Sequence, residues 1–501
     1  METITSINDF LNNIVWGPVG LALLFGAGLI MTIRTKAFQM SHFAHWLKKT
    51  IGAIFTNKHV TAHTGKKDKS ISQFQSLCTA LAATIGTGNI VGVSTAIISG
   101  GPGAIFWMWI MAILGMMTNY SENVLGIFYR RKNADGEWSG GAMYYLEKGL
   151  GAKKHMKTLG RVLAILFAVF CVIASFGIGN IAQVNSIAGN MDTAFGVPTW
   201  VTGIVLIFLI GLVVVGGLKR IASVTEKLVP FMAIAYIVLA LVAVFWHIDQ
   251  VPAAFASIFR CAFNFKAGVG GVAGFAVSQA ITFGFKRGAF SNEAGLGSSV
   301  MVHSNSNVKE PVQQGMWGIF EVFADTIIVC TLTALIILTS GMVDLQTGVL
   351  LQDVKASSLI GTIFSDMFGT FFGASVAPVG AMFIAVAVLL FAYSTVLGWS
   401  HYGSKSMEYL THNNRTIMTI YKMLFIVMSY FSATMELTLA WDLSDTFNGL
   451  MMIPNLIGVL ALSGTVAAIT KNYIDRTFRN RDLRPMYSAY EDVQAEQEKK
   501  D

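Results

Sequence analysis

The sequence is poor in charged residues. Asp, Glu, Lys and Arg make up only 13% of its 501 residues, whereas 54% are hydrophobic. Soluble domains carry about 25% charged residues, so this composition excludes an ordinary soluble domain. It predicts an all-α integral membrane protein with many spanning helices.

Other scarce features exclude several functions. The four cysteines are scattered without CxxC spacing, so we expect neither a zinc site nor a disulfide framework. The chain has no HExxH motif, Cys/His cluster or Gly-x-Ser-x-Gly elbow, which argues against an intramembrane enzyme. Lys and Arg lie in short loops between apolar runs and form no basic face for nucleic acid. We therefore expect no enzymatic activity, no cofactor and no nucleic-acid partner, and no obligate protein partner is evident.

Hydropathy predicts eleven transmembrane helices. Their approximate ranges are 15–34, 73–98, 103–129, 160–189, 198–217, 226–247, 270–286, 315–340, 371–400, 416–434 and 448–470. Lys and Arg concentrate in every second loop, which predicts an outside N-terminus and a cytoplasmic C-terminus in the cell membrane. No Lys or Arg precedes the first apolar run, so we expect a retained helix there and no cleaved signal peptide.

The number of helices suggests an internal repeat. Without the first helix ten remain, five plus five, and the odd number in each half inverts the second half. We expect an N-terminal helix with a basic cytoplasmic segment (1–70), a first repeat (71–248), an inverted second repeat (249–471) and a cytoplasmic tail (472–501). Short amphipathic segments are predicted at 252–265, at 138–150 and in part of 37–56. The charged tail after Pro485 is predicted to be disordered.

The stretch from Thr84 to Gly92 interrupts the second apolar run. It holds three glycines, two threonines and an asparagine, which is unusual within a spanning helix. Non-helical backbone survives at membrane depth only where it is buried in protein or lines a cavity. A second discontinuous helix is predicted in the other half, at Ile281–Phe285. Glycine also permits close helix packing, but the matched pair favours a transporter binding site.

The first interruption can bind ions of both signs. A half-helix that starts near Asn89 directs free N–H groups, those of Thr87 and Gly88, toward a carboxylate. The half-helix that ends near Ile85 presents free carbonyls, including those of Ala82 and Thr84, to a small cation such as sodium, and the Asn89 side chain adds an oxygen.

Two hydroxyls in the ninth helix extend this prediction. Ser394 and Thr395 either bond back to the preceding turn or complete the cation cage with Ala82 and Ile85. Trp399, one turn further along, is predicted to wall the pocket.

Other polar residues in apolar segments leave alternatives open. Asn180 and Gln183 share a helix face and are predicted either to contact a polar substrate or to bond neighbouring helices. Glu321 and Asp325, four residues apart on one helix face, are candidates for a proton relay, a cation site or helix pairing. Glu122 lies near Arg130, which favours a gate or an ion pair. His303 and Glu293 belong to an inner loop, where gating and a structural role are equally expected.

Three blocks carry a family resemblance. Gly100–Gly115 (GGPGAIFWMWIMAILG) resembles the signature of the alanine or glycine:cation symporters, and Gly86–Gly92 and Gly288–Gly297 also look like that family. The similarity covers nearly the whole chain. It implies a sodium-coupled carrier of small neutral amino acids with the inverted five-plus-five fold of the amino acid–polyamine–cation superfamily.

The resemblance also implies roles for individual residues. Thr87 and Gly88 would hold the substrate carboxylate, with Asn89 beside them. The sodium site would comprise Ala82, Ile85, Ser394 and Thr395. Phe283 and Gly284 would receive the substrate amino group. Bulky Phe283 and Trp399 favour alanine or glycine, whereas Asn180 and Gln183 leave room for glutamine; serine is a further candidate substrate. A proton-coupled carrier is the nearest rival, because of Glu321 and Asp325, and an ion channel is a weaker one.

Overall fold

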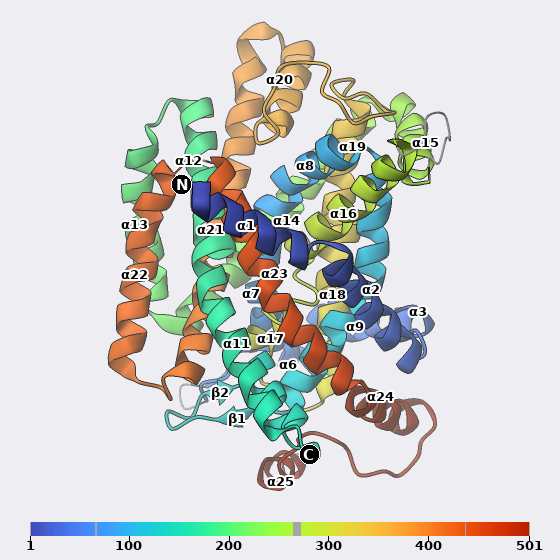
Figure 1. The fold of residues 1–501 in the computed structure, drawn as a ribbon, viewed down its shortest axis with the longest axis vertical. Helices are drawn as coiled ribbons and strands as arrows, with labels where there is room; N and C mark the ends of the chain where they lie inside the picture. The colour runs from blue at the N-terminus through green and yellow to red at the C-terminus, as the bar shows by residue number, and fades with distance from the viewer. Residues whose placement is uncertain (1, 66–67, 264–271, 436, 500–501) are drawn as a thin grey trace.

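A computed structural model describes residues 2–65, 68–263, 272–435 and 437–499 (Figure 1). The described chain is helical apart from one two-stranded hairpin and isolated bridges. Among the described residues, seven helices are long and apolar enough to cross a membrane, or eight if a pair bent by 57° counts as one span. The chain is therefore an all-helical membrane protein, and the number eleven stays a prediction.

The first half begins with two helices and a set of short ones. The elements up to residue 100 are α1 (Glu2–Val15), α2 (Pro18–Arg34), α3 (Phe38–Ser41), α4 (Phe43–Lys49), α5 (Ile51–Thr56), α6 (Lys58–Thr61), α7 (Gln73–Thr84), η1 (Thr87–Asn89) and α8 (Val91–Gly100). Next come α9 (Gly103–Phe128), β1 (Arg131–Lys132), β2 (Trp138–Ser139), α10 (Ala142–Tyr144), η2 (Tyr145–Leu150), α11 (Lys157–Phe176), η3 (Gly177–Ile181), α12 (Ala182–Phe195), α13 (Thr199–Val214) and α14 (Gly217–Trp246).

The second half continues the helical pattern. Its elements are η4 (Ile248–Gln250), α15 (Val251–Ala262), α16 (Val272–Asn292), α17 (Val300–His303), α18 (Pro311–Val322), η5 (Phe323–Cys330), α19 (Thr331–Thr339), α20 (Leu359–Phe372), η6 (Ala374–Val376), α21 (Ala377–Leu410), α22 (Arg415–Thr434), α23 (Leu437–Ala461), α24 (Ser463–Phe478) and α25 (Glu491–Glu498). Two helices organise the interior: α9 packs against α16 and α18, and α21 packs against α7, α11 and α12 (Figure 1).

The first predicted interruption is confirmed. Helix α7 starts at a capping box in which Ser72 and Gln75 satisfy each other's backbone N–H groups. It ends at Thr84, a single 3₁₀ turn follows at Thr87–Asn89, and α8 resumes at Val91. Every residue from Thr84 to Val91 is buried, so non-helical backbone lies inside the protein.

The second interruption lies about two helical turns beyond the predicted place. The prediction of a break at Ile281–Phe285 is wrong, because α16 is continuous from Val272 to Asn292. Gly284 serves close packing instead, since a Cβ there would lie 2.6 Å from the Ala104 carbonyl oxygen of α9. The backbone leaves the helix only after Asn292, and Glu293, Gly295 and Gly297 adopt positive φ angles of 56°, 93° and 70°.

Wide π-helical turns occur at three places in the described chain: one follows the short helix α10, and two lie inside long helical segments. They are η2, η3 and η5, at residues 145–150, 177–181 and 323–330. A π-helical turn holds more residues than an α-helical one, so it rotates the faces that follow it. Residues that share a face on an ideal helix can therefore point to different neighbours here.

Two surface predictions also need correction. The segment 138–150 is not a single amphipathic helix, because Trp138–Ser139 pairs with Arg131–Lys132 as an antiparallel hairpin. The tail after Pro485 is not disordered, because Glu491–Glu498 forms α25. This helix is held by an ion pair between Asp492 and Arg131 at 2.5 Å, and just before it the Ala489 N–H donates to the Phe128 carbonyl at 2.9 Å.

Candidate functional site

A cluster of buried oxygens joins α7 to α21. The Thr395 hydroxyl donates to the Ala82 carbonyl at 2.9 Å, and the Ser394 hydroxyl approaches the same oxygen at 3.3 Å. Both hydroxyls also bond back to the Phe391 carbonyl, at 3.0 and 2.8 Å. Ile85 caps the end of α7 beside them. Both hydroxyls therefore bond back within α21, as one alternative predicted, and both also contact the Ala82 carbonyl; the binding of a cation there stays a prediction.

The N–H side of the interruption is occupied by a glutamine. The Gln183 side-chain oxygen accepts a hydrogen bond from the Thr87 hydroxyl at 3.0 Å and from the Thr87 N–H at 3.3 Å. Its amide nitrogen is fixed by the Ile178 carbonyl, at 3.1 Å. An amide oxygen thus stands where the oxygen of a carboxylate would be received.

Gly86 lies between these two groups of atoms. A Cβ at Gly86 would be 2.5 Å from the Thr395 hydroxyl oxygen and 3.2 Å from the Gln183 oxygen. Only a glycine lets the oxygen cluster and the N–H side approach so closely. At Gly88 a Cβ would meet Phe290 and Ser291, both at 3.2 Å. The end of α16 therefore covers the interruption from the other side.

Asn89 connects the interruption to a buried acid. Its side-chain oxygen accepts from the Gly86 N–H at 2.9 Å, and its amide nitrogen donates to the Asp325 carboxylate at 2.6 Å. Ser291 and Thr326 each donate to the other carboxylate oxygen, at 2.8 Å. Asp325 is completely buried. The sequence marked Asp325 as a candidate but gave no sign that it lies at this interruption.

Glu321 points elsewhere, although it precedes Asp325 by only four residues. It lies 2.9 Å from the His303 ring and 3.4 Å from the Asn119 amide. The π-helical turn η5 begins between the two acids and separates their directions. The expectation of a shared face is therefore wrong for this pair.

Asn180 and Gln183 separate for the same reason. Asn180 lies in η3 and bonds α22, through the Phe425 carbonyl at 2.9 Å and the Ser429 and Ser432 hydroxyls at 3.2 and 2.9 Å. Gln183 instead reaches Thr87. Asn180 therefore follows the alternative of helix–helix bonding. Gln183 contacts the first interruption, and its contact with a substrate stays a prediction.

Trp399 links α21 to the second interruption. Its indole N–H donates to the Glu293 carboxylate at 2.8 Å, and Ser298 donates to the other oxygen of that carboxylate at 2.5 Å. Glu293 and Trp399 are buried. Glu293, for which the sequence predicts either a gating or a structural role, is thus part of the buried second interruption.

Phe283 and Gly284 do not join this group. They precede Phe290, which covers Gly88, by seven and six residues, which is about 10 Å along a helix. A Cβ at Gly100 would meet the Phe283 side chain at 3.0 Å, which places Phe283 beside the end of α8. Their predicted contact with the substrate amino group depended on a break that α16 does not have.

Glu122 and Arg130 each bond other partners, so the predicted ion pair between them does not form, while the alternative of a gate stays a prediction. Glu122 accepts a 2.5 Å hydrogen bond from Asn455, which also donates to the Gly295 carbonyl. Arg130 donates to the carbonyls of Ser304, Ser306 and Val308. Glu122 therefore braces the second interruption, and Arg130 holds the loop beyond it.

Comparison with known proteins identifies the family. The family model described as the sodium:alanine symporter family matches residues 1–487. The chain belongs to this family. It is 42% identical to the sodium/alanine symporter AgcS of Methanococcus maripaludis over 473 residues, which cover 94% of this chain and 98% of that protein.

Two further comparisons add breadth. The chain is 35% identical over 485 residues to a Bacillus subtilis protein described as the probable sodium/glutamine symporter GlnT, with 96% of this chain and 92% of that protein covered. Among solved structures, that of MhsT in complex with L-phenylalanine matches with a TM-score of 0.53 at 13% identity, covering 81% of this chain and 99% of that one. The likeness to the MhsT structure concerns the fold alone.

Proposed function

We propose that this protein moves a small neutral amino acid, alanine or glycine in the first place, into the cell together with sodium by alternating access. Serine and glutamine are further candidates. The proposed protein has eleven spanning helices, an N-terminal helix followed by inverted repeats at 71–248 and 249–471, an outside N-terminus and a cytoplasmic C-terminus. The family and its sodium symporters support the general class of this proposal.

The single observation that carries the proposal is that one interruption holds both an oxygen cluster suited to a cation and N–H and hydroxyl groups suited to an anion. The Ala82 carbonyl and the Ser394 and Thr395 hydroxyls supply only oxygens, which suit a hard cation such as sodium. On sodium binding, the hydroxyl protons can stay with the Phe391 carbonyl while the hydroxyl oxygens turn to the ion. In this mechanism the backbone that carries the Ala82 carbonyl keeps its position when sodium binds.

The anion end has a comparable mechanism. The substrate carboxylate would replace the Gln183 oxygen at the Thr87 N–H and hydroxyl, and it would gain the positive end of α8. Gly86 keeps the two ends close, so sodium and carboxylate attract each other across it. Each bound ion then raises the affinity for the other, as reciprocal coupling requires.

The test is uptake into vesicles containing the purified protein. Alanine uptake should saturate and should require sodium outside. Competition with unlabelled glycine, serine and glutamine ranks the substrates. Uptake that persists when choline replaces sodium would refute sodium coupling, and an ohmic current without saturation would favour a channel.

Proton coupling is the second candidate, and Asp325 favours it. This completely buried carboxylate receives hydrogen bonds from the neutral groups of Asn89, Ser291 and Thr326. A charged carboxylate at this depth needs a cation or a proton. If protons drive transport, a pH gradient should drive uptake by the parent protein, and Asp325→Asn should abolish that uptake. If sodium alone drives transport, the variant should still require sodium, and a pH gradient should have no effect on its uptake.

A further inference from the structure

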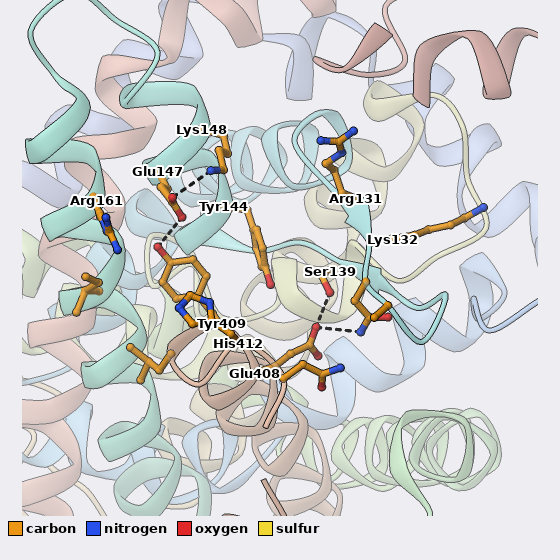
Figure 2. Close-up of a pocket in the computed structure, with 15 residues that line it drawn as sticks. Arg131, Lys132, Ser139, Tyr144, Glu147, Lys148, Arg161, Glu408, Tyr409 and His412 are labelled. Carbon is orange, nitrogen blue, oxygen red and sulfur yellow. Dashed lines mark hydrogen bonds and ion pairs between the residues drawn. The ribbon is translucent and has the colours of Figure 1, made fainter. Parts of the chain in front are cut away.

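A pocket lies at the end of the molecule where α11 begins and α21 ends. It has a volume of about 660 Å³, and Figure 2 shows its lining side chains. The hairpin β1–β2, the π-helical turn η2, the first turns of α11 and the last turn of α21 enclose it. Four cations line it, Arg131, Lys132, Lys148 and Arg161, against two carboxylates, Glu147 and Glu408.

The two carboxylates are already compensated. Glu408 forms a 2.7 Å ion pair with Lys405 and accepts hydrogen bonds from Ser139 and Asn133. Glu147 accepts from the Tyr409 hydroxyl at 2.8 Å and from Lys148 at 3.1 Å. Burial raises the pKa of Glu147, but these hydrogen bonds and the charges of Lys148 and Arg161 outweigh it and hold the pKa below its ordinary value. Arg131 and Lys132 pair with acids outside the lining, Asp492 and Glu496, at 2.5 and 2.9 Å. The remaining positive charge of the pocket therefore comes from one further cation.

Arg161 supplies that remaining charge. It is exposed, and no hydrogen bond or ion pair joins it to another residue of the described chain. Figure 2 shows it on the same side of the pocket as Glu147, Lys148 and Tyr409. The Lys148 ammonium is half exposed and keeps free donors beyond its bond to Glu147. An arginine fork with a neighbouring ammonium is suited to a phosphate group.

The pocket continues into an apolar stripe. Helix α11 exposes large apolar side chains three or four residues apart, and Ile165, which lines the pocket, belongs to this stripe: Leu159, Val162, Ile165, Leu166 and Val169. In a membrane protein such a helix face meets lipid chains. Arg161 precedes Ile165 by one turn, about 6 Å, so the cation sits at the border between lipid and water.

We propose that this pocket binds an anionic phospholipid of the cytoplasmic leaflet. Arg161 and Lys148 hold its phosphate, and its acyl chains lie along the stripe of α11. Tyr144 and Tyr409 also line the pocket, and tyrosines are enriched where a membrane protein borders the headgroup region. The site goes beyond the transport cycle proposed above; only the naming of the leaflet depends on the proposed orientation. Basic pockets between helices on the cytoplasmic side are typical lipid headgroup sites.

The test is lipid binding to the purified full-length protein, measured by native mass spectrometry. Phosphatidylglycerol should bind more tightly than phosphatidylcholine, and Arg161→Gln should weaken phosphatidylglycerol about fivefold, as expected for one cation near a lipid surface. Arg161→Lys, which keeps the charge and loses the fork, should give a smaller loss. Lys154→Gln is the matched control, because Lys154 is an exposed cation of the loop before α11 and does not line the pocket.

Three results would overturn the proposal. Equal losses for Arg161→Gln and Lys154→Gln would mean that only the general surface charge attracts the lipid. Equal affinity for the two lipids would exclude recognition of an anionic headgroup. Displacement of phosphatidylglycerol by glycerol phosphate at equal concentration would mean that the pocket binds free phosphate compounds. Arg161→Gln removes no bond of the described structure, so its folding, checked by thermal unfolding, should match that of the parent protein.

Discussion

Replacing Thr395 by valine is the sharpest perturbation of the proposed sodium site. Valine keeps the branched shape of threonine and removes only the hydroxyl that lies 2.9 Å from the Ala82 carbonyl. The bound cation would lose one oxygen ligand, and Ser394, at 3.3 Å from the same carbonyl, would remain. The substitution therefore tests one ligand without emptying the site.

The expected magnitude follows from the type of interaction. A hydrogen bond to a charged group contributes about 1.5–3 kcal/mol, and an oxygen ligand of a cation in a buried site is of similar size. The sodium concentration for half-maximal alanine uptake should therefore rise about 10- to 100-fold. The alanine half-saturation at high sodium should change much less, because the Thr87 end stays intact.

The assay needs controls for loss of a buried hydroxyl. Thr339→Val removes a hydroxyl that bonds only to the Leu335 carbonyl, at 2.8 Å, among the described residues. Thr395→Ser restores the hydroxyl and should recover most of the sodium affinity. The reasoning is refuted if Thr395→Val folds and transports with unchanged sodium dependence, or if Thr339→Val shifts it equally.

Three further predictions follow from the same site and from the tail. Gly86→Ala should abolish uptake while the protein still folds, because the new Cβ would lie 2.5 Å from the Thr395 hydroxyl oxygen; Gly92→Ala, whose nearest Cβ neighbour is at 4.0 Å, should leave uptake nearly unchanged. Gln183→Glu should raise the alanine half-saturation more than about tenfold, because a carboxylate would repel the substrate at the Thr87 N–H; uptake kinetics like those of the parent would contradict this. The tail helix α25 should lose hydrogen-exchange protection in acid: the hydrogen bond from Arg131 lowers the pKa of Asp492, so its stabilising effect is present above the ordinary pKa of about 3.9 and is lost as the pH falls through the lowered value. Arg131→Gln should reduce that protection only modestly at neutral pH, because this ion pair is exposed and Lys132 and Arg484 also pair with acids of α25; equal protection in the variant would exclude this role of the ion pair.

Sequence reasoning located the first interruption because its signal was chemical. Three glycines and three polar residues in nine positions of an apolar run are hard to explain by packing. The hydroxyls of Ser394 and Thr395 were correctly joined to Ala82 for the same reason, since they are the adjacent pair of hydroxyls in their apolar helix. Gln183 bonds Thr87 of the interruption; bonding to a neighbouring helix was one of the two alternatives predicted for Gln183, and its contact with a substrate stays a prediction.

The second interruption was misplaced because glycine has two uses. Gly284 permits contact with α9, where a Cβ would meet backbone atoms, and its helix continues. Gly295 and Gly297 permit positive φ angles, and their backbone is not helical. Composition does not distinguish the two uses, whereas the polar run Ser291–Glu293 before the later glycines is a signal of the same kind as in the first interruption.

The misassigned helix faces have a different cause. The spacing of Asn180 and Gln183, and of Glu321 and Asp325, was interpreted with the 3.6-residue period of an α-helix. In each pair a π-helical turn lies at or between the residues, and no residue type marks such a turn in the sequence. As a result, one residue of each pair (Gln183 or Asp325) contacts the first interruption, and the other (Asn180 or Glu321) bonds residues elsewhere.

Buried hydrogen bonds connect both interruptions to helices that lie elsewhere in the protein. Gln183 ties the interruption to the helix of η3, Asn89 ties it through Asp325 to the helix of η5, and Trp399 ties α21 to the second interruption through Glu293. Each tie is a buried hydrogen bond whose loss leaves an unsatisfied group, which is costly inside a membrane protein. A carboxylate that displaces the Gln183 oxygen must therefore give Gln183 a new partner, and η3 must shift to provide it. We expect this exchange of partners, and not a change in sodium contacts, to start the movement of η3 relative to α7, which spin labels on α12 and α7 would detect on adding alanine in the presence of sodium.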